Sequence, residues 1–333
     1  MSQVWFALRS RRSILPGKPL LSSSSSRRQT FAAALAQFEE QMTAAKVVSP
    51  ATQPLNLYYG LAQAGMAIGA ARSSADQWSF SRHGLRLGDL SQDLADIRVG
   101  PDGDGAFQRM VSATGSAPID SPVRLGALWD SLHELQWVDL SDSPRRVALD
   151  LLPDSSTLSA SLFLPYDQLQ PGPDLHSRIY DILAAYPGAE GAAIPSDTEA
   201  IQPPEREPQR WIVRLEWPAL QAQDPRTEAE IREFFDQIAP EDRYRDDRFL
   251  RPCVEGGNRP PPSPLMTWWL LLYSFSMLAR YQPRKWTALL DLDKSRCAVS
   301  LQYALDTALS AIPHLVLEAL DGRSFLLSRP VTF

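Results

Sequence analysis

Two apolar, aromatic-rich segments, residues 54–68 and 268–286, lie near opposite ends of this 333-residue chain. Large apolar side chains recur in both at steps of three and four residues: Leu57, Leu61, Ala64 and Ile68 in the first, and Trp268, Leu271, Leu272, Phe275 and Leu278 in the second. This spacing predicts helices that each carry one apolar face. Burying five large side chains on each face would contribute on the order of 10 kcal/mol. We therefore expect residues 28–72 and 264–320 to pack together in one helical core.

The composition is typical of a soluble globular protein, with 44% apolar and 9% aromatic residues. The longest apolar run, residues 265–272, is well short of the roughly 18 residues that a membrane-spanning helix needs. We therefore expect no membrane association and a cytoplasmic location. The 28 prolines predict many short elements joined by stiff loops.

The charge of the chain is unevenly distributed. Residues 1–30 contain six basic side chains and no acidic one, whereas the whole chain has a net charge of −6, so the remainder carries −12. A segment rich in arginine and serine and lacking acids resembles an organellar transit peptide. We instead expect it to belong to the mature protein, with its arginines meeting acids elsewhere in the chain or on a partner.

The sequence lacks the usual signatures of metal and cofactor sites. Cys253 and Cys297 are the only cysteines, and neither belongs to a C-x-x-C pair. Gly17 and Lys18 lack the preceding glycines of a phosphate-binding P-loop. No G-x-G-x-x-G or G-x-S-x-G motif is present. We therefore predict no metal site and no cofactor.

The middle of the chain predicts mixed secondary structure. The turn residues 100–105 lie between two runs that could pair, 97–99 and 107–111, which indicates a hairpin. Ser121 and Pro122 are typical of a helix start. Further elements follow from periodicity: strands at 147–152, 158–164 and 211–217, helices at 177–186 and 227–238, and a later helix at 301–312.

These patterns predict an α+β fold that is predominantly helical. Its helical core is formed by both chain ends, with a mixed α/β segment inserted between them. We place the N-terminal helical part at residues 1–90, the inserted segment at 91–259, and the C-terminal helical part at 260–333, packed on 1–90.

The two aromatic segments together resemble the signature blocks of the bacterial YaaC-like family. The first block is Pro54 to Ile68 with the later triplet His83-Gly84-Leu85, and the second is Trp268 to Trp286. The chain departs from the family pattern at Met66, where a basic residue is usual, and at Arg82, where a glycine is frequent. The resemblance implies an architecture and candidate positions, and it assigns no reaction.

The candidate functional residues come from these two blocks. His83 could serve as a general acid or base near neutral pH, or its ring could simply fix a turn. The basic residues after the second helix could hold an anion, or they could cap the helix C-terminus. The candidates for a ligand or anion site are Tyr58, Tyr59, Arg82, His83, Arg280, Arg284, Lys285 and Trp286.

Tyr58 and Tyr59, followed by small residues, also resemble the Tyr-Tyr-Ala helix of HEPN proteins, many of which are ribonucleases. The catalytic signature of that family has an arginine four to six residues before a histidine. None of His83, His133 and the other two histidines has an arginine at that spacing. A HEPN-like scaffold stays open as an alternative, whereas a HEPN nuclease of the usual type is disfavoured.

Three functional hypotheses remain. The preferred one is a non-catalytic interaction or ligand-sensing protein, acting as a subunit of a bacterial stress or defence assembly, with a protein partner or a second copy of itself. The second is an enzyme acting on a nucleotide or phosphorylated substrate, with His83 as acid/base and Arg82, Arg280 and Lys285 holding the anion. The third is an RNA-associated, HEPN-like module.

Overall fold

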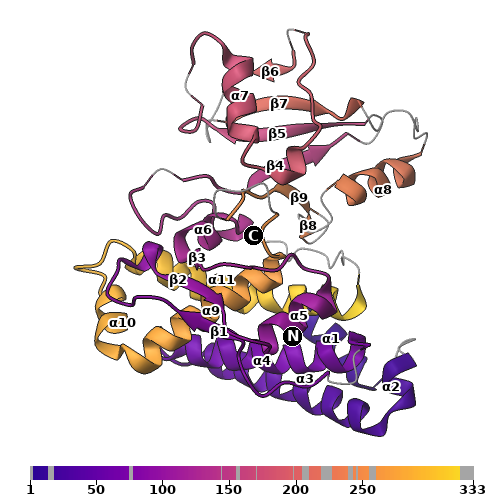
Figure 1. Ribbon diagram of the computed structural model, residues 1–333, viewed down its shortest axis with the longest axis vertical. Helices are drawn as coiled ribbons and strands as arrows, with labels where there is room; N and C mark the ends of the chain where they lie inside the picture. Colours follow the sequence, from indigo (N-terminus) through magenta and orange to yellow (C-terminus); the bar gives the residue numbers. More distant parts are fainter. Residues whose placement is uncertain are drawn as a thin grey trace. The chain divides into compact units, whose positions relative to one another are not determined.

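The computed structural model describes residues 3–13, 19–74, 78–143, 145–154, 158–169, 171–197, 199–204, 210–218, 227–238, 243–244, 247–254 and 260–322. The fold is α+β with helix predominating, as predicted (Figure 1). The chain divides into two compact units. The helical unit is residues 1–129, 137–143 and 262–333, and the sheet unit is residues 130–136 and 144–261.

The elements of the helical unit come from both ends of the chain. From the N-terminal part they are α1 (Gln3–Ser13), α2 (Pro19–Ser23), α3 (Ser25–Ala45), α4 (Gln53–Arg72), β1 (Leu85–Leu87), β2 (Arg98–Pro101), α5 (Ala106–Thr114), β3 (Val123–Arg124) and α6 (Leu125–Asp130). From the C-terminal part they are α9 (Pro264–Tyr281), α10 (Pro283–Leu289) and α11 (Ala298–Asp321). Residues 91–129, which the sequence assigns to the inserted segment, thus group with the helical unit.

Helix α4 is the centre of the helical unit. It packs along α3 and also contacts α5, α9 and α11 (Figure 1). The predicted packing of residues 28–72 against 264–320 is therefore confirmed. Gly65 permits the close approach of α4 to α9, because a Cβ atom at this position would lie 2.6 Å from the ring of Trp269. Trp268, Phe275 and Leu278 of α9 are fully buried, as predicted.

Helix α11 is longer than the predicted helix at residues 301–312. It runs from Ala298 to Asp321 and contains Pro313 in its interior. An internal proline costs about 3 kcal/mol because it removes a backbone hydrogen bond. Leu315, Val316, Leu317 and Leu320, all beyond the proline, are buried, and burying each such side chain contributes about 1.5–3 kcal/mol. Burial of this last stretch therefore offsets the proline.

The hairpin predicted around residues 100–105 is wrong in its second half. Residues 98–101 form the strand β2, which pairs with β1 and β3 rather than with residues 107–111. Residues 107–111 instead belong to helix α5, whose Phe107 and Met110 are buried. The helix predicted to start at Ser121 begins later, because Val123 and Arg124 first form β3.

The basic N-terminal segment meets acids of the same unit, as predicted. Arg9 forms an ion pair with Glu39 of α3, and Arg11 forms one with Asp321 at the end of α11, with an N–O distance of 2.7 Å. Arg72, at the end of α4, donates to the carbonyl oxygen of Ala319. These contacts tie the first helix and the last helix into one unit.

The sheet unit contains an antiparallel sheet with strand order β6-β7-β5-β4-β9-β8. Its elements are β4 (Leu149–Pro153), β5 (Ser159–Pro165), α7 (Leu175–Leu183), β6 (Ile201–Gln202), β7 (Arg210–Glu216), α8 (Glu228–Ile238), β8 (Arg243–Tyr244) and β9 (Asp247–Leu250). One face of the sheet forms a core with α7 and α8. The alternation predicted for β7 is confirmed, since Trp211, Val213 and Leu215 are buried. Helix α8 begins with a capping box, in which Thr227 and Glu230 hydrogen-bond to each other.

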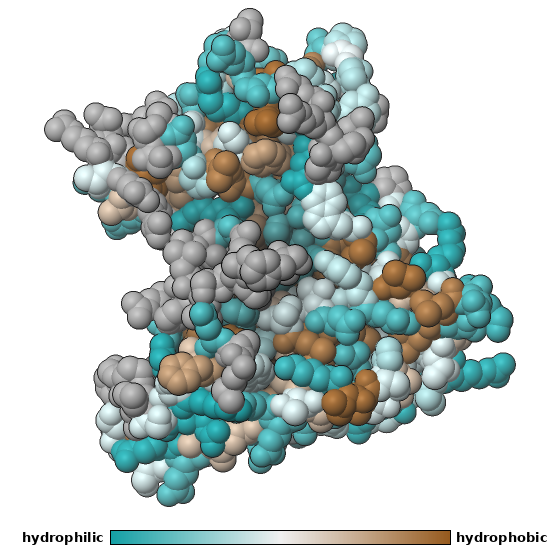
Figure 2. Space-filling view, turned by 180° about the vertical axis from the view of Figure 1, so that it is seen from behind, coloured by the Kyte–Doolittle hydropathy of each residue, from teal (hydrophilic) through white to brown (hydrophobic). Residues whose placement is uncertain are grey.

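The surface carries apolar side chains only in small groups on the face seen in Figure 2, outside the residues drawn in grey. Phe6, Val47 and Val299 are among the large apolar residues that remain exposed. Single exposed apolar residues are normal on a soluble surface. No helix within the described ranges combines the length and the apolar character that crossing a membrane requires.

Candidate functional site

The His83 turn is held against the N-terminus of helix α5. The backbone N–H of Ala106 donates to the carbonyl oxygen of Arg82 at 2.8 Å, and that of Phe107 donates to the carbonyl oxygen of His83 at 3.1 Å. The first N–H groups of a helix lack partners within the helix. The turn satisfies two of them, so its backbone is fixed by the helix that follows it in the sequence.

Gly84 makes this close approach possible. Its φ angle is +73°, a conformation that L side chains rarely adopt. A Cβ atom at Gly84 would lie 1.9 Å from Oε1 of Gln108, and one at Gly105 would lie 2.3 Å from the Gly84 nitrogen. Gln108 spans the gap, since its Nε2 donates to the Gly84 carbonyl and its Oε1 accepts from the Gly105 N–H. The turn is therefore compact and rigid.

The His83 side chain joins aromatic residues from α4 and α9. We call Tyr58, Tyr59, His83, Tyr273 and Arg280 the tyrosine–histidine cluster. The hydroxyl of Tyr58 lies 2.8 Å from Nδ1 of His83. The centroids of the Tyr58 and Tyr273 rings lie 5.5 Å and 5.6 Å from the centroid of the His83 ring. The two sequence blocks at opposite ends of the chain therefore meet at this cluster.

The hydrogen bond between Tyr58 and His83 determines which imidazole nitrogen carries the proton. Tyr58 is buried, and burial raises the pKa of its hydroxyl, with the phenols of Tyr273 and Tyr59 adding to the rise. The hydroxyl therefore keeps its proton. Among the described residues, His83 Nδ1 is the hydrogen-bond partner of this hydroxyl, and a buried donor left without an acceptor would be costly, so we assign Tyr58 as the donor. Neutral His83 accordingly has its own proton on Nε2.

The indole of Trp269 also faces this phenol. Its ring meets the Tyr58 ring edge-on, with centroids 6.2 Å apart. Its N–H opposes the rise in the Tyr58 pKa, yet Nε1 of Trp269 lies outside hydrogen-bond geometry with every described residue. The indole therefore adds an edge-on ring contact to the cluster.

Arg280 gives the cluster a positive charge at its solvent-exposed side. Its guanidinium donates to the Tyr59 hydroxyl at 3.1 Å and lies 5.0 Å from the centre of the Tyr281 ring. Burial lowers the pKa of His83, and the positive charge of Arg280 lowers it further. Both effects favour the neutral imidazole. Tyr59 and Tyr281 are 41% and 61% exposed, so a ligand can reach this side of the cluster.

Tyr273 of this cluster was not among the predicted candidates, nor was Asp102, whose charge acts on it. The Tyr273 hydroxyl donates to the carbonyl oxygen of Leu85 at 2.7 Å and so ties α9 to the strand that follows the turn. Burial raises the pKa of Tyr273, and the charge of Asp102 adds to the rise. Tyr273 lies seven residues before Arg280, which places both on one face of a helix. From that spacing Tyr273 could have been predicted as a neighbour of Arg280. The approach of Asp102 to Tyr273 could not, because it depends on the tertiary fold.

The remaining candidates are not part of the cluster. Lys285 donates to the carbonyl oxygens of Leu90 and Gln92, which ties α10 to the loop before β2. Trp286 is buried and stacks on Phe275, with ring centroids 5.7 Å apart. Arg284 is exposed in the first turn of α10. Of Arg280, Arg284 and Lys285, which are predicted as one group of cations, only Arg280 belongs to the tyrosine–histidine cluster.

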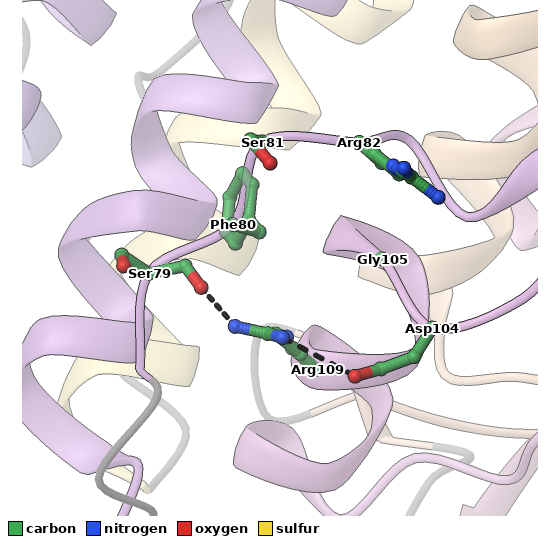
Figure 3. Close-up of a pocket in the computed structure, with 7 residues that line it drawn as sticks. All are labelled: Ser79, Phe80, Ser81, Arg82, Asp104, Gly105 and Arg109. Carbon is green, nitrogen blue, oxygen red and sulfur yellow. Dashed lines mark hydrogen bonds and ion pairs between the residues drawn. The ribbon is translucent and has the colours of Figure 1, made fainter.

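Arg82 points to a separate pocket on the other side of the same segment. The lining residues are Ser79, Phe80, Ser81, Arg82, Asp104, Gly105 and Arg109 (Figure 3). The pocket has a volume of about 420 Å³. Arg109 closes one end, since its guanidinium donates to the Ser79 carbonyl oxygen and pairs with the Asp104 carboxylate.

Comparison with known proteins identifies the family of the chain. The model of the YaaC-like proteins matches residues 17–320, which is nearly the whole chain. The chain belongs to the YaaC-like protein family. No curated protein and no solved structure matches significantly. The helices that carry both halves of the tyrosine–histidine cluster thus lie within the region that defines a YaaC-like protein.

Proposed function

We propose that this YaaC-like protein is a non-catalytic, ligand-sensing protein that binds a small anion at the tyrosine–histidine cluster. One observation carries the proposal. The Tyr58 hydroxyl bonds to Nδ1 of His83, so the imidazole offers an N–H donor at Nε2, and Arg280 is near enough for its charge to act on the imidazole. Two donors, one of them cationic, suit a phosphate or carboxylate group.

The same hydrogen bond argues against His83 as a catalytic base. A general base needs an unprotonated nitrogen within reach of the substrate proton. In the neutral tautomer described above, Nδ1 is engaged by Tyr58 and Nε2 is protonated. Burial and the charge of Arg280 also lower the pKa of His83, which disfavours the charged form that could act as a general acid. Binding therefore fits this geometry better than proton transfer.

We extend the proposal to the setting of the protein. Tyr59 and Tyr281 are exposed tyrosines beside an arginine, and these residue types are enriched at protein interfaces. In a sensor, a protein partner or a second copy of the chain would bind differently when the anion site is occupied. We propose that the protein acts in this way as a cytoplasmic subunit of a bacterial stress or defence assembly. Cys253 and Cys297 form no disulfide, which suits a reducing compartment.

Replacing Arg280 with alanine should weaken anion binding by one to two decades, because it removes a charge-assisted contact of roughly 1.5–3 kcal/mol. The measurement begins with a thermal-shift screen of nucleotides and phosphorylated metabolites, followed by calorimetric titration of each hit. Arg284→Ala is the matched control, since it removes the same charge from an exposed residue four positions further along the chain.

Equal affinity of the wild type and Arg280→Ala for every hit would exclude the cluster as the binding site. Each hit is also incubated with the protein, and the mixture is analysed for products by mass spectrometry. Turnover that is lost in His83→Gln would favour the enzyme hypothesis over the sensor.

The proposal also predicts a change in the titration of His83. Because Arg280 lowers the pKa of His83, Arg280→Ala should raise it, and Arg284→Ala should leave it in place. A bound anion favours the charged imidazole and should raise the same pKa in the wild type. Binding then takes up a proton, so the affinity should increase as the pH falls from about 8 to about 6. NMR titration of the imidazole signals measures both shifts, and a decrease over this range in the affinity for a carboxylate, whose own charge stays constant, would contradict the proposal.

A further inference from the structure

The pocket lined by Arg82 lies apart from the tyrosine–histidine cluster. The segment 79–82 forms one wall, and the turn from Asp104 to Arg109 forms the other (Figure 3). The next residue, His83, does not line this pocket, and its ring packs against Tyr58 and Tyr273. One segment of chain therefore supplies residues to two different sites.

The walls of the pocket are held in place by Arg109. Its guanidinium donates to the Ser79 carbonyl on one wall and pairs with Asp104 on the other, with a distance of 3.2 Å between Nη2 and Oδ2 (Figure 3). The close contact of Gly105 with Gly84 fixes the backbone of the second wall. A pocket whose opposite walls are joined by hydrogen bonds needs little reorganisation to bind a ligand.

The lining combines three kinds of recognition group. Arg82 is exposed and presents a guanidinium that can hold a phosphate. Phe80 is half-buried in the wall and offers an aromatic surface on which a flat ring can stack. Asp104 is exposed, and a carboxylate accepts hydrogen bonds from hydroxyl or amino groups. With Arg82 and Arg109 positive and Asp104 negative, the lining carries one net positive charge.

We propose that this pocket is a second ligand site that binds a nucleoside monophosphate. The base stacks on Phe80, the ribose hydroxyls donate to Asp104, and the phosphate pairs with Arg82. The volume of about 420 Å³ lies within the roughly 300–1,000 Å³ that is usual for small-molecule pockets. One net positive charge matches a single phosphate monoester better than a triphosphate.

The experiment is a calorimetric titration of the full chain with AMP, GMP, CMP and UMP, each compared with its nucleoside and with inorganic phosphate. Saturable binding of at least one monophosphate, tighter than its nucleoside, is expected. Arg82→Gln should raise the Kd by roughly 10- to 100-fold. Arg86→Gln is the matched control, because Arg86 is an exposed arginine four positions further along that lies outside the pocket.

Two further variants separate the parts of the site and the two proposals. Phe80→Leu should weaken nucleotide binding at least roughly fivefold and leave the affinity for inorganic phosphate unchanged. Arg280→Ala should bind the nucleotide as the wild type does, because Arg280 belongs to the tyrosine–histidine cluster. No saturable binding of any monophosphate by the wild type would overturn the inference. An unchanged Kd in Arg82→Gln, or a loss of affinity in Arg280→Ala in place of Arg82→Gln, would also overturn it.

Discussion

Replacing Trp268 with alanine should reduce the free energy of unfolding of the helical unit by about 3–5 kcal/mol. Trp268 is fully buried in α9, at the centre of the core built from both chain ends. Its indole N–H has no hydrogen-bond partner among the described residues. Alanine therefore loses packing and leaves a cavity, without breaking a hydrogen bond. Urea denaturation followed by far-UV circular dichroism measures the loss.

Trp137→Ala is the control for this prediction. Trp137 belongs to the same unit but is 55% exposed, so its truncation removes far less buried surface. Its effect should stay below about 1 kcal/mol, as is usual for surface substitutions. A Trp268→Ala variant with the denaturation midpoint of the wild type would show that this part of the core is packed differently.

Replacing Gly84 with alanine should cost about 2–5 kcal/mol, because two penalties combine. The φ angle of +73° is strained for alanine, and the new Cβ atom would lie 1.9 Å from Oε1 of Gln108 and 2.9 Å from the backbone Cα of Gly105. Relief of the overlap requires Gln108 to release the N-terminus of α5. The turn would then move, the bond from Tyr58 to His83 would be lost, and anion binding at the cluster should fail. Thermal denaturation and the anion titration measure the two effects on one sample.

Gly103→Ala distinguishes strain from overlap. Gly103 has a similar φ angle of +69°, but no atom lies within 4 Å of the Cβ position. It should cost only the left-handed penalty of about 1–2 kcal/mol and should leave anion binding intact. Equal destabilisation by the two substitutions would mean that the contact between Gly84 and Gln108 is not a constraint.

The long helices could be predicted from the sequence because their signal is local. In α3, α4 and α9, apolar side chains at three- and four-residue steps identify the buried face without knowledge of what covers it. The strand β7 was equally clear from its alternation. These elements were enough to predict the helical core and the meeting of its two halves.

The errors arose where a distant residue decides the local structure. The turn residues before Phe107 favour a hairpin, but Gln108 finds its partner at Gly84, and this contact stabilises a helix start instead. In the same way, Lys285 was grouped with Arg280 by proximity in the sequence, although its acceptors are carbonyls of the loop before β2. A sequence pattern within one segment cannot predict hydrogen bonds to residues that are distant in the chain.

The candidate site was therefore predicted in part. The meeting of His83 with Arg280 follows from the packing of the two blocks, which the apolar faces required. The tautomer of His83 does not follow from the sequence, because it depends on the burial of one hydroxyl, that of Tyr58. The pocket beside Arg82 was also missed, since its second wall comes from the turn that was assigned to a hairpin.

The ion pair between Arg11 and Asp321 joins the first helix to the last, so the helical unit is complete only after α11 has been synthesised. A ribosome releases α1 to α4 first, but α4 cannot bury its apolar face until α9 and α11 have been synthesised. The sheet unit, whose residues all precede 262, emerges in the interval and can fold before synthesis ends. The first helices must therefore remain unaggregated while an entire second unit is translated. During that interval a chaperone that shields apolar helices would protect the nascent chain, and a stop codon before residue 298 would leave the helical unit without its closing helix.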